Sequence, residues 1–387
     1  MKTSDSYKLK NINGTNYLLP VGQSIALLKK GIQLNETSSL LWNALKNGID
    51  ENDLLTHLIE YYGTDHSDVP NLQADILSCL QQMADLHLIS RETDTPACSL
   101  YLNIGKLIIG YHGPRHLLHP SLLDFVCSRN TIHQNWTIVP QAPDPYPLGE
   151  FIVRTREIEI LRNHEDYIIT LLSTYPSIQI KITLDGVNAR FYCTPPYSEA
   201  HIEPLFHAFR HAFLLYAQKM GVYALHSSSI LYQDKVWLFS GPSGMGKSTQ
   251  SSLWKRLYQV RILNGDLNLI QLESTTPMVS GLPWCGTSNI YSKETFPLGG
   301  VILLKKQNVN CILEMTKTEQ ILTITQRLIS PVWTEDMLSS NLEFSNDLVN
   351  QIPIFKLLCT TDPAAAHILR EYIQQLLQCN RPNSIDL

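Results

Sequence analysis

Hydrophobic residues near the start of the chain follow the two-residue period of strands. Residues 7–12 alternate between apolar and polar, Asn13-Gly14 is a typical hairpin turn, and residues 17–20 resume the extended pattern. Further extended stretches are expected at 24–29 and 31–34. The pattern predicts a small antiparallel sheet.

The hydrophobic period then changes to that of helices. Apolar residues recur at helical spacing in three segments, and Thr37 is the expected N-cap of the first. Strands followed by three short helices are typical of a winged-helix-like domain, here over residues 1–95. The apolar positions are Leu40, Leu41, Trp42 and Leu45; Leu54, Leu55, Leu58 and Ile59; and Leu72, Ile76, Leu80, Met83 and Leu86.

A polar stretch that ends the first domain, residues 91–97, contains a proline and is expected to be a linker. Residues 98–200 have strong β character and no chemical motif. They are expected to pack on the domain that follows or to form part of it. The expected strands are 99–109, 151–161, 167–172, 178–184 and 189–193.

Residues 201–387 show the alternation of helices and strands of an α/β domain. The expected elements are a helix at 203–219, strands at 222–231 and 234–240, a helix at 249–258, a strand at 260–266, and an amphipathic helix that ends near 378.

The segment between the strand at 234–240 and the helix at 249–258 matches the phosphate-loop pattern G-x-x-x-x-G-K-[ST] at every required position. Its small residues let backbone N–H groups surround phosphate oxygens, where a Cβ would obstruct them. Lys247 offers a charge for the β- and γ-phosphates, and Ser248 offers a hydroxyl to Mg²⁺. The sequence therefore predicts a site for ATP, or another nucleoside triphosphate, with Mg²⁺. The expected nucleotide-binding residues are Gly241, Ser243, Gly244, Gly246, Lys247, Ser248 and Thr249.

Two further residues are candidates for the same chemistry. Asp266 ends the strand at 260–266, where a carboxylate serves a nucleotide site as a Mg²⁺ ligand or as a base. His226 interrupts an apolar strand. Taken alone, a hydrogen-bonded core histidine is its ordinary explanation, and a functional role is the alternative.

Charge, cysteine spacing and hydropathy narrow the class of protein. The net charge of −5 resides in the first 95 residues, with seven Lys and Arg against twelve Asp and Glu, which argues against nucleic acid as a partner. No run approaches the roughly 18 apolar residues of a membrane span, and the first residues lack the apolar core of a signal peptide. The eight cysteines form no C-x-x-C pair, as expected of reduced thiols in a cytoplasmic protein.

Three histidines surround a Gly-Pro-Arg turn, at His112, His116 and His119. A metal site is conceivable there. Their spacing fits no helical ligand pair, however, so surface or turn histidines are the favoured explanation.

The sequence LNETSSLLWNAL at residues 34–45, preceded by YLLP and followed by LHLI at 86–89, resembles the PqqD-like family. These are small domains that hold the leader segment of a ribosomally made precursor peptide for a modifying enzyme. The resemblance implies that residues 1–95 bind such a leader as an extra strand on an exposed sheet edge. A DNA-binding winged helix is the alternative, but the acidity of the domain argues against it because a recognition helix needs nearby Lys and Arg.

Five segments resemble the HPr kinase/phosphorylase-like family over roughly residues 205–375: LHSSSI, LFSGPSGMGKST, LNGDLNLI, LPWCGTSN and FPLGGVILL. The family phosphorylates hydroxyls of protein or peptide substrates. The resemblance implies that His226 lies beside the phosphates, that Lys247 and Ser248 bind nucleotide and magnesium, and that Asp266 accepts the hydroxyl proton. Gly265 stands where the bacterial HPr kinases have the first Asp of a pair, and their glycine-rich arginine segment has no convincing copy. Both departures argue against phosphorolysis and against HPr as the substrate.

Together these features predict a multidomain α/β and α+β protein: a PqqD domain, a strand-rich region and a phosphate-loop kinase domain. By resemblance to kinases of lasso-peptide clusters, we expect it to phosphorylate a Ser or Thr hydroxyl in the core of a precursor that it holds by the leader. We expect no nucleic-acid or membrane partner, and a homo-oligomer stays open. A small-molecule or amino-acid kinase and a nucleotide-gated delivery scaffold are the alternatives.

Overall fold

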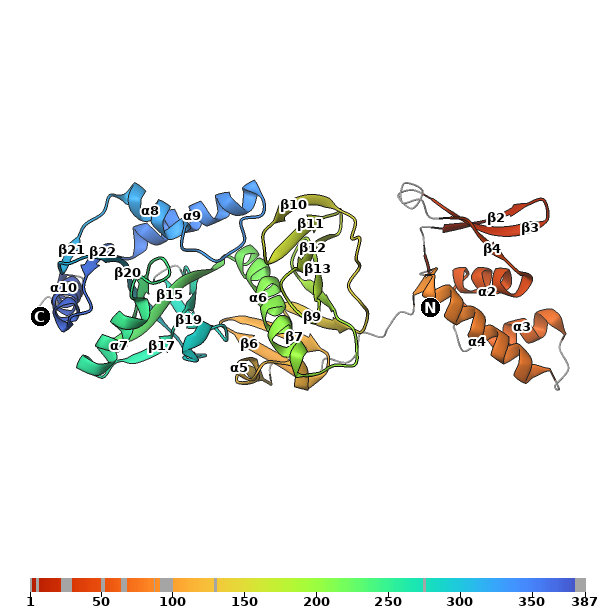
Figure 1. Cartoon of the computed structure of the whole chain (residues 1–387), viewed down its shortest axis with the longest axis horizontal. Coiled ribbons are helices and arrows are strands. Elements are labelled where there is room, and N and C mark those ends of the chain that lie inside the picture. The colour runs from red at the N-terminus through yellow and green to blue at the C-terminus, as the bar shows by residue number, and fades with distance from the viewer. Residues whose placement is uncertain are drawn as a thin grey trace, which may run out of the picture. The chain divides into compact units, whose positions relative to one another are not determined.

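The computed structural model describes residues 2–4, 7–21, 30–49, 53–63, 68–86, 88–90, 100–128, 131–273 and 276–379. The chain divides into two compact units, Met1–Pro96 and Ala97–Leu387 (Figure 1). Both units combine helices with sheets, which confirms the predicted mixed α/β multidomain class. The linker predicted at 91–97 and the strand predicted at 24–29 lie outside the described residues.

The described residues of the smaller unit form a three-stranded antiparallel sheet and three helices, besides one pair of short strands. Asn13 and Gly14 both have positive φ, 50° and 84°, as the two-residue turn of the expected hairpin requires. The sheet order is β2 (Tyr7–Ile12), β3 (Thr15–Pro20) and β4 (Ile32–Leu34). The helices are α2 (Glu36–Lys46), α3 (Leu54–Tyr62) and α4 (Val69–Asp85), and the short strands β1 (Lys2–Thr3) and β5 (Ile89–Ser90) pair with each other.

The core of the smaller unit joins the sheet to its helices. Leu18 of β3 belongs to one buried cluster with apolar residues of these helices, among them Trp42 of α2. Asn35, and not the expected Thr37, caps α2, because its side-chain oxygen accepts a hydrogen bond from the Ser38 N–H at 2.8 Å. Asn35 has the extended backbone of an N-cap residue, whereas Thr37 already lies in the first turn.

The larger unit begins with a nine-stranded sheet. Its strand β9 runs parallel to both neighbours, β14 and β7, and was not predicted. The stretches of expected β character at 99–109 and 151–161 each contain a turn and contribute to hairpins. The order is β10 (Glu150–Arg154), β11 (Ile158–Arg162), β12 (Asp166–Leu171), β13 (Gln179–Thr183), β14 (Asn188–Tyr192), β9 (Gln134–Val139), β7 (Leu107–His112), β6 (Leu100–Ile104) and β8 (Val126–Cys127).

Helix α6 (Ile202–Lys219) connects this sheet to the rest of the larger unit. On one side, the Phe209 ring stacks on Trp136 of β9 with centroids 4.7 Å apart. On the other side, Phe213 contacts Trp284 at 5.4 Å. These residues belong to a single buried cluster, so the strand-rich region and the domain that follows it share one core.

An eight-stranded mixed sheet carries the phosphate-loop segment. Its strand β15 pairs with β18 through residues 222–226 and with β16 through residues 227–232. Because β16 also pairs with β20, and β20 with β19, the strands β15, β18, β19, β20 and β16 close a ring. The strands are β15 (Val222–Tyr232), β16 (Lys235–Ser240), β17 (Arg261–Asn264), β18 (Leu267–Gln271), β19 (Met278–Gly281), β20 (Thr295–Lys306), β21 (Cys311–Leu313) and β22 (Ile354–Cys359).

Two pairs of helices cover opposite faces of this sheet. Leu238 and Phe239 are neighbours on β16, so their side chains point to opposite faces. Phe239 packs with Trp254 of α7, and Leu238 belongs to the cluster that contains Leu348 of α9. The first pair is α7 (Lys247–Tyr258) and α10 (Pro363–Cys379); the second is α8 (Lys317–Thr325) and α9 (Glu335–Gln351), which the hydrophobic pattern did not reveal.

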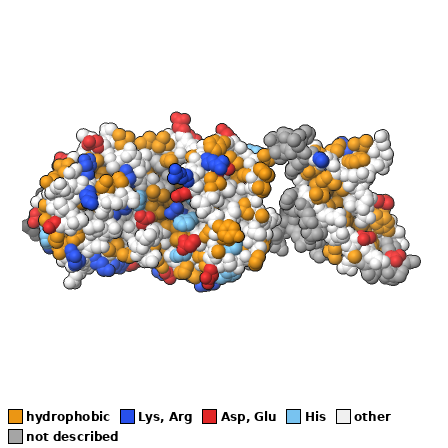
Figure 2. Space-filling model, viewed as in Figure 1, with side chains coloured by type: hydrophobic (Ala, Val, Ile, Leu, Met, Phe, Trp, Pro, Cys, Tyr) orange, Lys and Arg blue, Asp and Glu red, His pale blue; other side chains and the backbone are white. Residues whose placement is uncertain are grey.

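The surface of the larger unit brings charged side chains of both signs together with histidines near its middle, on the face shown in Figure 2. Among the described residues, no helix is both long and apolar enough to cross a membrane. The structure shows free thiols at Cys79, Cys127, Cys193, Cys285, Cys311 and Cys359.

Candidate active site

Consecutive serines on β15 connect the phosphate-loop segment to the turn that carries Asp266. The hydroxyl of Ser228 donates to the carbonyl oxygen of Lys247 at 3.1 Å. The hydroxyl of Ser229 accepts a hydrogen bond from the Asn264 N–H at 2.9 Å. Both serines are fully buried, so water does not compete for these bonds. One strand thus fixes both halves of the candidate site.

The loop between β16 and α7 has the backbone of an anion-binding turn. Gly244 and Gly246 have φ angles of 77° and 95°, which glycine adopts without steric cost. A Cβ on Gly241 would lie 3.2 Å from the carbonyl oxygen of Leu304, tighter than ordinary contact. The loop leads into the N-terminus of α7, where unpaired N–H groups favour a negative charge. This backbone fits the phosphates of a nucleotide.

The polar side chains of the loop are accessible. The Lys247 ammonium donates to the carbonyl oxygen of Gly241 at 3.0 Å, which places its charge over the loop. Ser243, Ser248 and Thr249 are exposed at the surface. Their hydroxyls, at or next to the start of α7, can therefore reach a bound ligand or its metal ion.

Asp266 is anchored through both its backbone and its side chain. The side-chain oxygen of the fully buried Asn264 accepts hydrogen bonds from the N–H groups of Asp266 and Leu267, at 2.9 and 3.0 Å. The Ser227 N–H donates to the Asp266 carbonyl oxygen at 2.9 Å. Nε2 of His226 lies 3.1 Å from Oδ1 of the carboxylate. Asn264 therefore determines where the carboxylate lies, and no motif in the sequence indicated it.

Electrostatics tie the three predicted catalytic residues together. The hydrogen bond from His226 lowers the pKa of Asp266, the charges of Lys247 and Arg210 lower it further, and burial opposes them without cancelling their effect. Asp266 is therefore ionised near neutral pH. Burial lowers the pKa of Lys247, the nearby Asp266 raises it, and repulsion from Arg327 lowers it. The fold brings His226, Lys247 and Asp266, which lie on separate segments, into one charged cluster.

Two arginines extend this cluster, and sequence reasoning missed both. Arg327 follows α8, and its carbonyl oxygen accepts a hydrogen bond from the His226 N–H at 2.9 Å. Its Nε is buried and has no hydrogen-bond partner among the described residues. Arg210 projects from α6 and acts on Asp266 electrostatically. A buried N–H donor without a partner costs stability, which an acceptor on a bound ligand would offset.

The surroundings of Gly265 leave no room for a side chain at this position. A Cβ at this position would lie 2.0 Å from Oγ of Ser288. The Ser288 hydroxyl is itself held, because it donates to the carbonyl oxygen of Cys285 at 2.7 Å. The Gly265 N–H donates to the carbonyl oxygen of Ile290 at 3.1 Å. The segment 285–290 therefore occupies the space that a side chain at position 265 would need.

Ser248 and Asp266 were the predicted magnesium ligands. In the described parts of the chain, no group of three or more His, Cys, Asp or Glu side chains could hold a metal ion, and this includes the histidines at 112, 116 and 119. Magnesium needs no such group, because it is usually bound by one or two protein ligands together with phosphate oxygens and water. An exposed hydroxyl at the start of α7 and an ionised carboxylate fit that kind of site.

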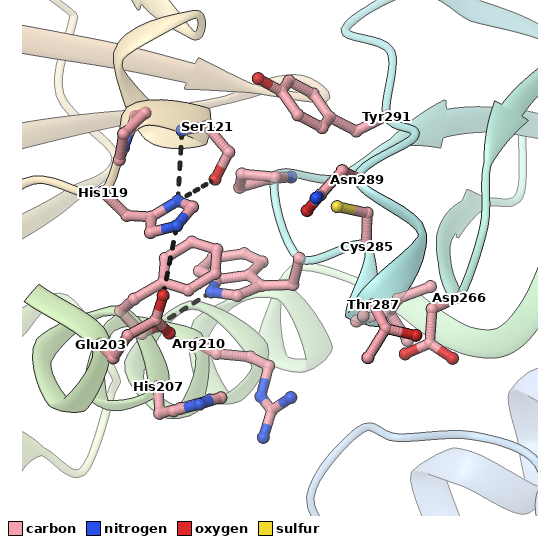
Figure 3. A pocket seen from close by; sticks show the side chains of 16 residues that line it. His119, Ser121, Glu203, His207, Arg210, Asp266, Cys285, Thr287, Asn289 and Tyr291 are labelled. Carbon is pink, nitrogen blue, oxygen red and sulfur yellow. Dashed lines mark hydrogen bonds and ion pairs between the residues drawn. The ribbon is translucent and has the colours of Figure 1, made fainter.

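A pocket of about 540 Å³ opens beside Asp266 (Figure 3). Its walls come from the start of α5 (Pro120–Leu123), from α6, and from residues 283–291. Asp266 thus lies between two features, since it interacts electrostatically with Lys247 of the phosphate loop and also lines the pocket. The labelled side chains in Figure 3 come from elements far apart in the sequence, and no local motif revealed the pocket.

Comparisons with known proteins found one family match and a similar solved structure. Residues 19–89 match the family described as Coenzyme PQQ synthesis protein D (PqqD). The smaller unit contains a PqqD domain. A solved structure, the Hpr(Ser) kinase/phosphatase from Coxiella burnetii, is similar to this chain at 12% identity and a TM-score of 0.27, covering 41% of this chain and 94% of that chain. No curated protein matches this chain.

The PqqD domain has a strand at the edge of its described sheet. β4 pairs with β3 on one side, with Gln33 opposite Tyr17, and is the last strand in the order. Gln33 is exposed, whereas Leu34 is buried in the core. An edge strand carries backbone groups that another extended chain can pair with. β4 is therefore one candidate site for an added strand, and β2 forms the other edge of the described sheet.

Proposed function

We propose that this protein is an ATP-dependent kinase that phosphorylates a Ser or Thr hydroxyl of a precursor peptide, which it holds by the leader. The observation that carries the proposal is the cluster of His226, Lys247 and Asp266 at a phosphate-loop backbone, in a chain that also contains a PqqD domain. The cluster supplies the chemistry of transfer. The PqqD domain supplies the choice of substrate.

Each group of the cluster has a defined part in transfer. The loop N–H groups and Lys247 would hold the β- and γ-phosphates, and the charge of Arg327 would add to theirs. Magnesium, held by Ser248 and Asp266 with the phosphates, would neutralise charge on the transferred group. The acceptor oxygen forms a bond to the γ-phosphorus while the bond from that phosphorus to the β–γ bridging oxygen breaks and ADP leaves.

Asp266 is the group that takes the proton from the acceptor. Its lowered pKa keeps it ionised, so it can accept a hydrogen bond from the hydroxyl and take the proton as the new bond forms. The hydrogen bond with His226 orients the carboxylate. The Asn264 contacts hold its backbone in place.

The PqqD domain makes delivery of the acceptor intramolecular. A leader paired along β4 would keep the core peptide close to the active site, at an effective concentration on the order of millimolar for a short flexible connection. A weakly binding acceptor pocket would then suffice. Loose sequence requirements around the acceptor hydroxyl are therefore expected in the natural substrate.

Mass spectrometry of a candidate precursor tests this proposal. The precursor would be a short peptide encoded beside this protein, with a leader and a Ser- or Thr-containing tail. After incubation with the full chain and Mg²⁺-ATP, we expect its tail to gain the mass of one phosphate. Nucleotide binding without any gain on the precursor would favour the delivery scaffold, and phosphorylation of a free amino acid in its place would favour the small-molecule kinase.

A further inference from the structure

We infer that the pocket beside Asp266 holds the phosphoryl acceptor, and that Arg210 selects an acceptor with a carboxylate close to its hydroxyl. The inference rests on the proposed function and adds to it the chemistry of the accepted residue. It also gives the strand-rich region a role, because that region forms one wall of the pocket.

The position of Asp266 identifies the pocket as an acceptor site. A hydroxyl in the pocket can meet the carboxylate from one side, while the phosphate loop and Lys247 lie within its electrostatic reach. A volume of about 540 Å³ is that of a site for a drug-sized ligand, so it suits a short stretch of peptide and excludes a folded domain.

The walls of the pocket are fixed by stacked rings from both halves of the larger unit. The His119 ring stacks on Phe206 with centroids 4.2 Å apart, and Phe206 stacks on Trp284 at 5.7 Å. The Trp284 indole N–H donates to the Phe206 carbonyl oxygen at 2.9 Å. Tyr291, in the same segment 283–291 as Trp284, hydrogen-bonds Asp124 of the strand-rich region. A preformed site of this kind loses little entropy when a ligand binds.

Arg210 is the one lysine or arginine among the described side chains that line the pocket. Figure 3 shows it projecting from α6 toward the side of the pocket where Asp266 lies. No described residue forms a hydrogen bond or an ion pair with its guanidinium. The two carboxylates of the pocket have other partners, since Glu203 lies 3.4 Å from His119 and Asp266 lies 3.1 Å from His226.

A carboxylate on the ligand would satisfy this guanidinium. Arginine presents a planar set of donors that matches a carboxylate in two parallel hydrogen bonds. Arg210 is half-buried, and burial lowers its pKa although Asp266 and Glu157 attract its charge, so the guanidinium gains from an anionic partner. With the hydroxyl at Asp266, that carboxylate belongs to the acceptor residue or to the next one. It is either an acidic side chain or the carboxyl end of the peptide.

Four short synthetic peptides at millimolar concentration test the inference with the full chain. In the first pair, a single serine ends the peptide with either a free carboxylate or an amide. In the second pair, the serine precedes Asp or Asn in an amidated peptide. We expect at least tenfold faster phosphorylation of the carboxylate member in one pair, measured by mass spectrometry, and the pair that responds identifies the source of the carboxylate.

Variants of the chain test whether Arg210 causes the preference for the carboxylate peptide over its amide counterpart. Arg210→Gln should bring the ratio of the two phosphorylation rates in the responding pair close to one. Arg210→Lys should retain part of the preference for the carboxylate peptide. The matched control Arg256→Gln, an exposed arginine on α7, should keep the full ratio. Calorimetric binding of Mg²⁺-ATP to each variant shows that the larger unit is folded.

The outcomes separate this inference from the proposed function. Equal rates within both pairs, or a ratio that Arg210→Gln leaves unchanged, would overturn the role of Arg210. Phosphorylation of none of the peptides, with Mg²⁺-ATP still bound, would overturn the acceptor pocket. Failure of the unaltered chain to bind Mg²⁺-ATP would overturn the proposed kinase itself.

Discussion

The imidazole of His226 lies 3.1 Å from the carboxylate of Asp266, although 40 residues separate them in the sequence. His226 lies near the middle of β15, and Asp266 follows the strand β17 that pairs with β15. The histidine ring is therefore part of the candidate site and not a buried core side chain. This pair sets the charge of the group that we propose as the base.

The pair predicts how activity depends on pH. Because the pKa of Asp266 is lowered, mainly by the His226 hydrogen bond, the carboxylate stays ionised and activity persists as pH falls toward that pKa. His226→Ala removes the bond and raises the pKa of Asp266, so the acidic limb of the pH–rate profile should move to higher pH. His226→Gln, which retains an N–H donor, should move it less. If the acidic limb of the pH–rate profile is the same in His226→Ala as in the unaltered chain, His226 does not lower the pKa of the catalytic base.

Lys247→Ala should remove phosphoryl transfer and leave the fold intact. The lysine charge faces the ligand, and its loss should lower the rate by about a hundred- to a thousandfold, as for other electrostatic donors. Initial rates of phosphopeptide formation measure the effect. Lys255→Ala, an exposed lysine on the same helix, is the matched control and should behave as the unaltered chain does. Near-normal transfer by the Lys247 variant would refute the phosphate-loop assignment.

Asp266→Asn separates the two roles proposed for this carboxylate. If Asp266 acts as the base, transfer should be lost while ATP affinity is kept, because the amide cannot take a proton. If it acts mainly as a magnesium ligand, ATP affinity should fall in the presence of Mg²⁺ and stay constant without it. Calorimetric titrations with and without Mg²⁺ distinguish the two. A fully active Asn variant would exclude both roles.

Gly265→Ala should destabilise the larger unit. The added Cβ would lie 2.0 Å from Oγ of Ser288, and overpacking of this kind costs typically about 1–3 kcal/mol of unfolding free energy. Chemical denaturation of the Gly265→Ala variant and of the unaltered chain measures this loss of unfolding free energy. Adding Ser288→Gly should recover part of the loss, since it removes the atom that clashes. An Ala variant as stable as the unaltered chain would show that the segment 285–290 moves aside easily.

The features that the sequence predicted correctly are formed by residues that lie close together in the chain. The phosphate loop was predictable because Gly241 to Thr249 follow one another, and α7 because its apolar positions are close in sequence. Asn264 and Arg327 were not predictable from residue patterns. Asn264 acts through a side-chain bond to the backbone, and Arg327 reaches the site because its carbonyl oxygen bonds β15 from more than 100 residues away.

Non-local pairing also hid part of the fold. The parallel strand β9 lies between β14 and β7, and a strand pattern alone does not reveal such neighbours. Thr37 was the wrong cap because Asn35 offers the same chemistry two residues earlier, and an N-cap preference alone does not decide between them.

Deleting residues 1–96 tests the division of labour between the two units. The hydrophobic core of the smaller unit is separate from the clusters that hold the candidate site, so the remaining chain should fold and bind ATP. Truncation removes the tether and leaves the chemistry in place.

The most direct measurement compares the intact and truncated chains on two substrates, full-length precursor and its leaderless core, as initial rates of phosphate incorporation. We predict that truncation sharply lowers transfer to the full-length precursor and barely changes the already slow transfer to the core peptide. If the truncated chain phosphorylates the full-length precursor as fast as the intact chain does, the PqqD domain does not deliver the substrate, and the account of a leader-directed kinase is wrong.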